Sequence, residues 1–253
     1  MDLTHFPEPE FNIHQLQINS YEVNFNNSLA IPSLFNLYQE IAWEHAKMLG
    51  FGWEDLREDG LFWALSRFRV EVLKLPLWKE KIHLITYPSG IDGLFALRDY
   101  EMYDISGEPL ILATSSWLIL NLANRKPIRT AEYMKGKQVV NRRSLTEYPS
   151  KIDKPSGNPS FSYTHTVMPG EIDVNNHINN VRYIEWAFNA VKIEVFKSSS
   201  PQIIEVNYLS EGFLNNQLLV ERYDSSDYEN LICIKRQDDE KDLSRVYIKW
   251  KTY

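Results

Sequence analysis

The same order of predicted elements occurs twice along this sequence of 253 residues, and this repeat limits the fold more than any other feature. In the first half, a strand pattern over residues 13–25 precedes a helical pattern over residues 31–49, and about four further strands follow. The second half repeats this order, with a strand over residues 161–168, a helical pattern over residues 178–196 and again four strands. Repetition of a whole element order indicates an internal duplication.

Matching residues accompany the repeat at a steady offset: Tyr38, Glu40 and Ala42 recur as Tyr183, Glu185 and Ala187. A long helix followed by antiparallel strands buries its apolar side only if the sheet wraps around it. This arrangement is the hotdog fold, so the sequence predicts an α+β protein with two tandem hotdog units, a double hotdog. The predicted domains are residues 1–123 and 161–253, joined by a polar linker over residues 124–160.

Composition narrows the class of function. The net charge of −7 argues against a surface that binds nucleic acid, and no apolar run approaches the length of a membrane span. The first residues do not resemble a signal peptide, and Cys233 is the one cysteine, so we expect a cytoplasmic protein. No metal-ligand spacing and no glycine-rich phosphate loop occurs, so no cofactor is expected.

A polar loop ahead of the second helical pattern carries the strongest functional signal. Asp and Asn directly before a helix are typical of an N-cap, and a loop that only caps the helix is one interpretation. Alternate residues of an extended loop point the same way, so Asp173, Asn175 and His177 are predicted to face one site. Free backbone N–H groups at a helix N-terminus favour negative charge, which suits a polarised carbonyl oxygen.

The stretch from Asp173 to Trp186, with its Asn residues, His177 and Tyr183, resembles the motif of acyl-acyl-carrier-protein thioesterases, which are hotdog enzymes. The resemblance covers about residues 18–250 and includes residues 206–212, which are similar to the segment with the family's catalytic Glu. Plant members carry a Cys directly after that Glu, where this chain has Gly212, and they carry organelle-targeting extensions that this sequence lacks. The resemblance therefore implies a bacterial-type member without a thiol nucleophile.

The resemblance implies hydrolysis of fatty acyl-acyl-carrier protein (acyl-ACP) to a free fatty acid, with Asp173, Asn175, His177 and Glu211 as the catalytic set. We expect direct attack by water, with Glu211 as the general base and His177 positioning water or moving a proton. Asp173 would orient His177 or Asn175, and Asn175 with helix N-terminal amides would hold the thioester oxygen. The roles of Glu211 and Asp173 remain exchangeable at this stage.

The expected partner is the carrier protein with its phosphopantetheine-linked acyl chain, and a homodimer is left open. A hotdog thioesterase acting on acyl-coenzyme A is the main alternative; a dehydratase-type lyase and a non-catalytic acyl-binding protein are others. Carrier proteins are acidic, so a local basic patch is needed for docking, and the linker arginines, among them Arg142 and Arg143, are the candidates.

The first half has no counterpart of the polar set. The stretch Ser28–Pro32, aligned with Asp173–His177, has no carboxylate and no imidazole, so one half is expected to keep the chemistry. The first half is then predicted to bind the acyl chain. Candidate residues for the wall of its tunnel are Leu34, Tyr38, Trp63 and Trp117.

Overall fold

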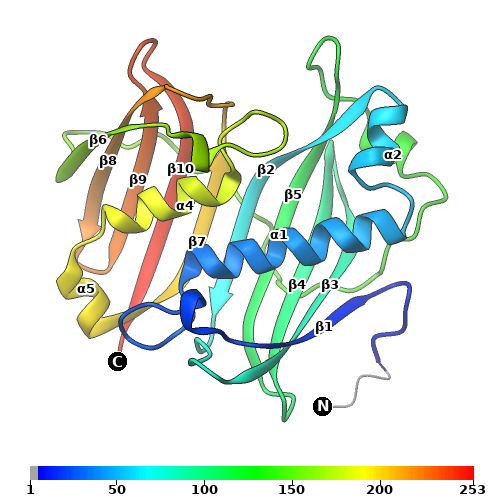
Figure 1. Ribbon diagram of the computed structural model, residues 1–253, viewed down its shortest axis with the longest axis horizontal. Helices are drawn as coiled ribbons and strands as arrows, with labels where there is room; N and C mark the ends of the chain where they lie inside the picture. The colour runs from blue at the N-terminus through cyan, green and yellow to red at the C-terminus, as the bar shows by residue number, and fades with distance from the viewer. Residues whose placement is uncertain (1–4) are drawn as a thin grey trace. The chain divides into compact units, whose positions relative to one another are not determined.

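The structure, a computed structural model, describes residues 5–253, and the chain divides into two compact units between Pro149 and Ser150. The polar segment of residues 124–160, predicted as a linker, is thereby divided: residues 124–149 belong to the first unit and residues 150–160 to the second. Each unit contains its own set of antiparallel strands and its own long helix (Figure 1).

In its described residues, 5–149, the first unit contains five strands and three α-helices. Its elements are β1 (Asn12–Gln17), η1 (Ser20–Glu22), α1 (Ile31–Met48), α2 (Trp53–Glu58), β2 (Leu61–Val72), β3 (Lys81–Asp92), β4 (Phe95–Asp104), β5 (Pro109–Asn121) and α3 (Thr130–Tyr133). The strands pair antiparallel in the order β1-β3-β4-β5-β2.

The second unit repeats this plan without a counterpart of α3. Its elements are β6 (Phe161–Thr166), η2 (Pro169–Glu171), α4 (Asn180–Asn189), α5 (Ile193–Ser198), β7 (Ser199–Tyr208), β8 (Gln217–Ser226), β9 (Glu229–Arg236) and β10 (Lys241–Thr252). The strands pair antiparallel in the order β6-β8-β9-β10-β7, which matches the first unit strand for strand. The predicted double hotdog is confirmed.

Helix α1 runs across the strands of its own sheet and buries an apolar face against it (Figure 1). Tyr38 on this face is 1% exposed and packs against the rings of Phe68 and Tyr100, whose centroids lie 5.6 and 4.5 Å away. Such close ring packing is typical of a core. Tyr38 and the fully buried Leu34 are therefore core residues of the first unit.

The second long helix is shorter than predicted. The sequence pattern predicts a helix over residues 178–196, whereas α4 ends at Asn189 and α5 begins at Ile193. The buried guanidinium of Arg222 donates a hydrogen bond to the carbonyl of Ala190 at 2.5 Å. This carbonyl is thus engaged by a residue of β8, and the chain turns before the next helical segment.

The structure also corrects the offset of the repeat. Strands β1 and β6 begin at Asn12 and Phe161, and helices α1 and α4 begin at Ile31 and Asn180, so equivalent residues lie 149 positions apart. The pairing of Tyr38 with Tyr183, 145 positions apart, was therefore wrong by about one helical turn.

Candidate active site

Three of the four predicted site residues, Asp173, Asn175 and His177, lie on a tight loop that connects η2 to α4. The Asp173 N–H donates to the carbonyl of His177 at 2.8 Å, and the Asn179 N–H donates to the carbonyl of Glu171 at 2.9 Å. Between these two pairs, Ile172 and Ile178 form a β-bridge. Residues 171–179, the polar loop below, are thus closed like a small hairpin.

Asp173 organises the inside of this polar loop. Its Oδ1 atom accepts hydrogen bonds from the backbone N–H groups of Asn175 at 2.8 Å and His177 at 3.1 Å. Asn176 has a φ of 62°, a left-handed conformation that Asn adopts more readily than most residues. Asp173 therefore orients both Asn175 and His177 through their backbone. The hydrogen bond between the Asp173 side chain and His177 is made to the backbone N–H of His177 and not to its imidazole ring.

The polar loop also caps the helix that follows it. The side chain of Asn179 accepts a hydrogen bond from the Val181 N–H at 2.9 Å, so the predicted N-cap is confirmed. Asn175 and His177 are half-buried just ahead of this helix start. The first backbone N–H groups of α4 favour negative charge at this end of the helix.

His177 and Glu211 are brought together from different parts of the chain. The Nδ1 atom of His177 lies 3.7 Å from Oε1 of Glu211, and the two side chains are 21% and 40% exposed. The ring of Phe213 meets the imidazole edge-on, with centroids 5.3 Å apart. Both polar groups therefore remain in reach of water beside an apolar ring.

Gly212 joins the segment with Glu211 to the polar loop. Its carbonyl accepts a hydrogen bond from the Ile178 N–H at 2.9 Å. A Cβ atom at this glycine would lie 2.3 Å from Cδ1 of Ile178, 3.0 Å from the Tyr183 hydroxyl and 3.1 Å from Cδ1 of Leu243. A side chain at this position would therefore require the neighbouring side chains to shift.

Tyr183, which was not predicted as a catalytic residue, lies next to the candidate site. Burial raises the pKa of its hydroxyl, the charge of Arg236 lowers it, and the carboxylates of Glu211 and Asp173 raise it. The hydroxyl is therefore neutral, and it lies close to Gly212, since a Cβ atom added at that glycine would be 3.0 Å from it. The sequence feature that could have pointed to Tyr183 is its position within the motif from Asp173 to Trp186.

The first unit contains the same loop without the same side chains. Oδ1 of Asn24 accepts the N–H groups of Asn26 at 2.8 Å and Ser28 at 3.4 Å, as Asp173 does in the second unit. The Asn24 N–H donates to the Ser28 carbonyl at 2.9 Å, and Asn27 has a φ of 63°. The counterpart of Asp173–His177 is therefore residues 24–28. The alignment with Ser28–Pro32 was wrong by four residues.

With the corrected alignment, the carboxylates and the imidazole of the predicted set still have no counterpart in the first unit. The Leu29 N–H donates to the Pro76 carbonyl at 2.8 Å, just as Ile178 donates to Gly212, so Leu75 stands in the place of Glu211. Asn24, Ser28 and Leu75 supply neither a carboxylate nor an imidazole.

The one cysteine of the chain, Cys233, lies on strand β9 and not on the polar loop. Cys233 is fully buried in β9, and burial raises the pKa of its thiol to about 11, so it is protonated at neutral pH. Among residues 5–253, no group of three or more His, Cys, Asp and Glu side chains is placed to hold a metal ion. None of the helices in this described part is both long and apolar enough to span a membrane.

The arginines predicted to dock a carrier protein have structural partners in the first unit. The guanidinium of Arg142 donates to both carboxylate oxygens of Glu101, at 3.0 and 2.7 Å, and lies over the ring of Phe6. The guanidinium of Arg143 lies 3.6 Å from the centroid of the Tyr148 ring. A guanidinium with such partners is not a freely solvated charge.

Comparison with known proteins places this geometry in a family. The profiles of the acyl-ACP thioesterase N-terminal and C-terminal domains match residues 11–136 and 158–252. The crystal structure of an acyl-ACP thioesterase from Bacteroides thetaiotaomicron matches 96% of this chain and 98% of its own, with a TM-score of 0.88 and 27% identity. A 12:0-ACP thioesterase from Umbellularia californica, 21% identical, shares the fold with the same TM-score of 0.88 over 96% of this chain and 98% of its own.

Proteins with similar sequences match this chain over part of their own length. An oleoyl-acyl carrier protein thioesterase of Arabidopsis thaliana is 26% identical over 77% of this chain and 58% of the relative. An acyl-[acyl-carrier-protein] hydrolase of Cuphea viscosissima is 30% identical over 77% of this chain and 50% of the relative. The chain therefore spans between half and three-fifths of the length of these relatives.

Proposed function

Since this chain belongs to the acyl-ACP thioesterase family, we propose that it hydrolyses the thioester bond of fatty acyl-ACP and releases the free fatty acid. The observation that carries the proposal is the contact between His177 and Glu211, 3.7 Å apart beside the N-terminal end of α4. An imidazole and a carboxylate with access to water are the groups that acid–base hydrolysis needs. The substrate would be the acyl group on the phosphopantetheine arm of the carrier.

Water is the nucleophile in this proposal. Its oxygen attacks the thioester carbon while Glu211 takes one of its protons, and negative charge develops on the former carbonyl oxygen. The Asn175 side chain and N–H groups at the start of α4 hold that oxygen. The tetrahedral intermediate then collapses with cleavage of the C–S bond, and the proton held by Glu211 passes through His177 to the departing sulfur, which returns Glu211 to its carboxylate form.

The surroundings of Asp173 support Glu211 as the base. Oδ1 of Asp173 already accepts two backbone N–H groups, so this oxygen is engaged in holding the polar loop in shape. The side chain of Glu211 is 40% exposed and lies close to the imidazole. Asp173 then shapes the polar loop, and Glu211 takes part in the chemistry.

The test is release of fatty acid from a purified acyl-ACP, with the same acyl group on coenzyme A as a second substrate. His177→Ala and Glu211→Ala should each lower turnover by about 10²–10⁴-fold without unfolding the protein. Ser28→Ala, at the position equivalent to His177, is the matched control and should leave turnover unchanged.

Two outcomes would contradict the proposal. Near-normal turnover in either site variant would remove that residue from the mechanism. If the wild-type protein releases no acid from acyl-ACP but hydrolyses the coenzyme A ester, the chain would instead be an acyl-coenzyme A thioesterase.

A further inference from the structure

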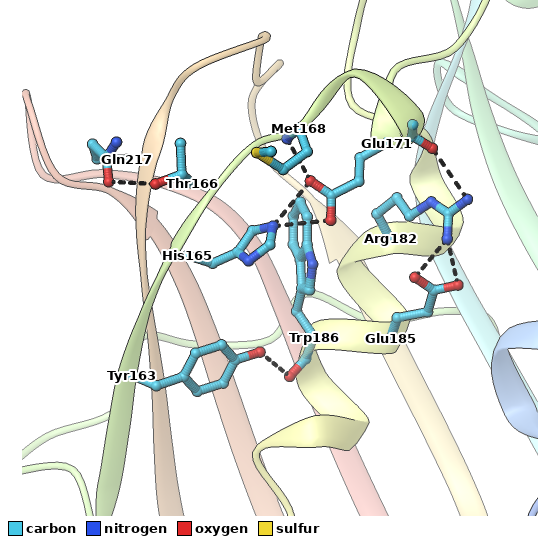
Figure 2. Close-up of polar contacts among 10 residues, drawn as sticks. Tyr163, His165, Thr166, Met168, Glu171, Arg182, Glu185, Trp186 and Gln217 are labelled. Carbon is cyan, nitrogen blue, oxygen red and sulfur yellow. Dashed lines mark hydrogen bonds and ion pairs between the residues drawn. The ribbon is translucent and has the colours of Figure 1, made fainter.

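The side chain of Glu171 joins separate elements of the second unit, as Figure 2 shows. Oε2 accepts the Met168 N–H at 2.7 Å, and Nε2 of His165 on β6 lies 2.9 Å from both carboxylate oxygens. The Glu171 side chain is only 16% exposed. Partial burial raises the pKa of this carboxyl, but hydrogen bonds from the Met168 amide and His165 bring the pKa below its ordinary value. Glu171 is therefore a carboxylate at neutral pH.

Glu171 also stands at the root of the polar loop. Its carbonyl accepts the Asn179 N–H and so closes the loop, and Asp173 follows two residues later. A shift of Glu171 would move both ends of this closure. It would therefore change the distance from His177 to Glu211, which approaches from a different segment.

His165 is itself held from the other side. Its ring packs against the indole of Trp186 on α4, with centroids 4.9 Å apart, and Trp186 is 4% exposed. The hydroxyl of Tyr163, two residues earlier on β6, donates to the Trp186 carbonyl at 2.9 Å. The imidazole thus bridges a fixed helix and strand to the carboxylate at the root of the loop (Figure 2).

The first unit provides an internal comparison. Glu22 is the counterpart of Glu171, and its Oε2 likewise accepts the Asn19 N–H at 2.7 Å. The residue in the place of His165, however, is Leu16, which offers no hydrogen bond. The cap at the root of the loop is therefore common to both units, whereas the imidazole contact occurs in the unit that also carries His177.

We propose that His165 and Glu171 are a positioning pair that holds the polar loop so that His177 meets Glu211. The inference rests on the proposed function, because it assigns the pair a part in thioester hydrolysis. Neither residue touches the reacting atoms. Their effect is exerted through the backbone between Glu171 and Asn179.

A pocket lies beside this pair, so a different side chain at His165 can be accommodated there. A cavity of about 390 Å³ borders it, and its lining consists of Phe161, Tyr163, His165, Glu171, Glu185, Trp186 and Asn189. The His165 side chain is 26% exposed. A changed side chain at this position therefore faces open space on one side.

The experiment replaces His165 by the residue of the other unit. His165→Leu should lower kcat on acyl-ACP by about tenfold with KM changed less than twofold, because loop displacement affects the chemical step. Glu171→Ala should lower kcat at least as much, because it also removes the cap on the Met168 N–H. The double variant should be no slower than Glu171→Ala alone, since the contact with His165 is already lost there. His165→Gln, which can still donate to Glu171, should restore much of the rate.

Glu22→Ala is the matched control, because it removes the same backbone cap from the first unit. It should leave kcat unchanged. Amide hydrogen exchange supplies a readout independent of activity: exchange of residues 173–179 should become about tenfold faster in His165→Leu and stay unchanged in Glu22→Ala.

The outcomes separate this inference from the proposed function. If His165→Leu and Glu171→Ala both keep wild-type kcat and wild-type exchange, the positioning pair is overturned. If the two single losses multiply in the double variant, the residues act independently and the pair is also overturned. If the wild-type protein hydrolyses no thioester, the proposed function fails, and the hydrogen-exchange comparison still decides whether the pair orders the loop.

Discussion

Asn24 and Asp173 occupy equivalent positions in two copies of one loop, and Oδ1 of each accepts two backbone N–H groups. The two loops share their closing hydrogen bond and one left-handed asparagine, Asn27 or Asn176. The duplication has thus kept the backbone of the loop in both units. The side chains suited to acid–base chemistry are present in the second unit.

Gly212→Ala should impair both stability and turnover. The new Cβ would lie 2.3 Å from Cδ1 of Ile178, and overpacking of this kind costs roughly 1–3 kcal/mol of unfolding free energy. It would also displace the neighbouring Glu211. Urea unfolding and steady-state hydrolysis measure the two effects, and a second change, Ile178→Val, should recover part of each. Wild-type behaviour of Gly212→Ala would show that the contact is not restrictive.

Cys233→Ser should remain an active thioesterase. The thiol is fully buried and its pKa is about 11, so almost no thiolate is present at neutral pH. Turnover on acyl-ACP before and after the substitution is the measurement. Loss of activity in a folded Cys233→Ser protein would require a thiol mechanism after all.

Arg142→Glu should unfold the first unit more readily, in contrast to a simple docking defect. The substitution would leave the carboxylate of Glu101, which is 2% exposed, facing a like charge, and breaking such a pair costs about 3–5 kcal/mol. Hydrolysis of a carrier-bound substrate and of a small soluble thioester should therefore fall together.

Arg129→Glu is the control for that experiment, because the exposed pair of Arg129 with Glu132 is a surface salt bridge. Its loss should change the unfolding free energy by less than about 1 kcal/mol. A defect of Arg142→Glu confined to the carrier-bound substrate would instead restore the docking role.

His45 should make the protein less stable as the pH falls from about 6.5 toward 4. Burial and the positive charge of Arg98 lower the pKa of His45 to about 4 in the folded protein. The unfolded chain, with an ordinary pKa near ~6.5, then binds the proton more readily, so stability is complete above that pH and is lost on the way down.

The loss assigned to His45 is at most about 3 kcal/mol, since each pKa unit corresponds to roughly 1.4 kcal/mol. Urea unfolding at both ends of this pH interval measures it. His45→Gln should show a smaller loss than the wild-type protein. An equal loss in the two proteins would assign the pH dependence to other groups.

The order of elements and helix α1 could be predicted because they depend on local periodicity. The end of α4 could not, because the apolar pattern continues past Asn189 and local periodicity does not reveal the hydrogen bond between the Ala190 carbonyl and Arg222 of β8. The offset of the repeat failed for a related reason. A slip of four residues is close to one helical turn and leaves the apolar face nearly unchanged, so sequence matching did not detect it. Backbone hydrogen bonds of the two loops fixed the offset.

The candidate site was only partly within reach of sequence reasoning. Asp173, Asn175 and His177 share one loop, whereas Glu211 was assigned from resemblance alone, because its approach to His177 depends on the backbone bond between Ile178 and Gly212. The partnership of Glu171 with His165 was missed. An acidic residue in a first helical turn is a common cap, and a histidine in a strand pattern gives no sign of which group it will meet.

The two copies of the loop also affect how the chain can change over generations. In the first unit, Asn24 and Ser28 keep the loop closed without supplying an acid or an imidazole. A mutation that introduced such a group there would meet a backbone already folded to receive it. Substitutions at this loop can therefore change its side chains while the backbone conformation stays the same.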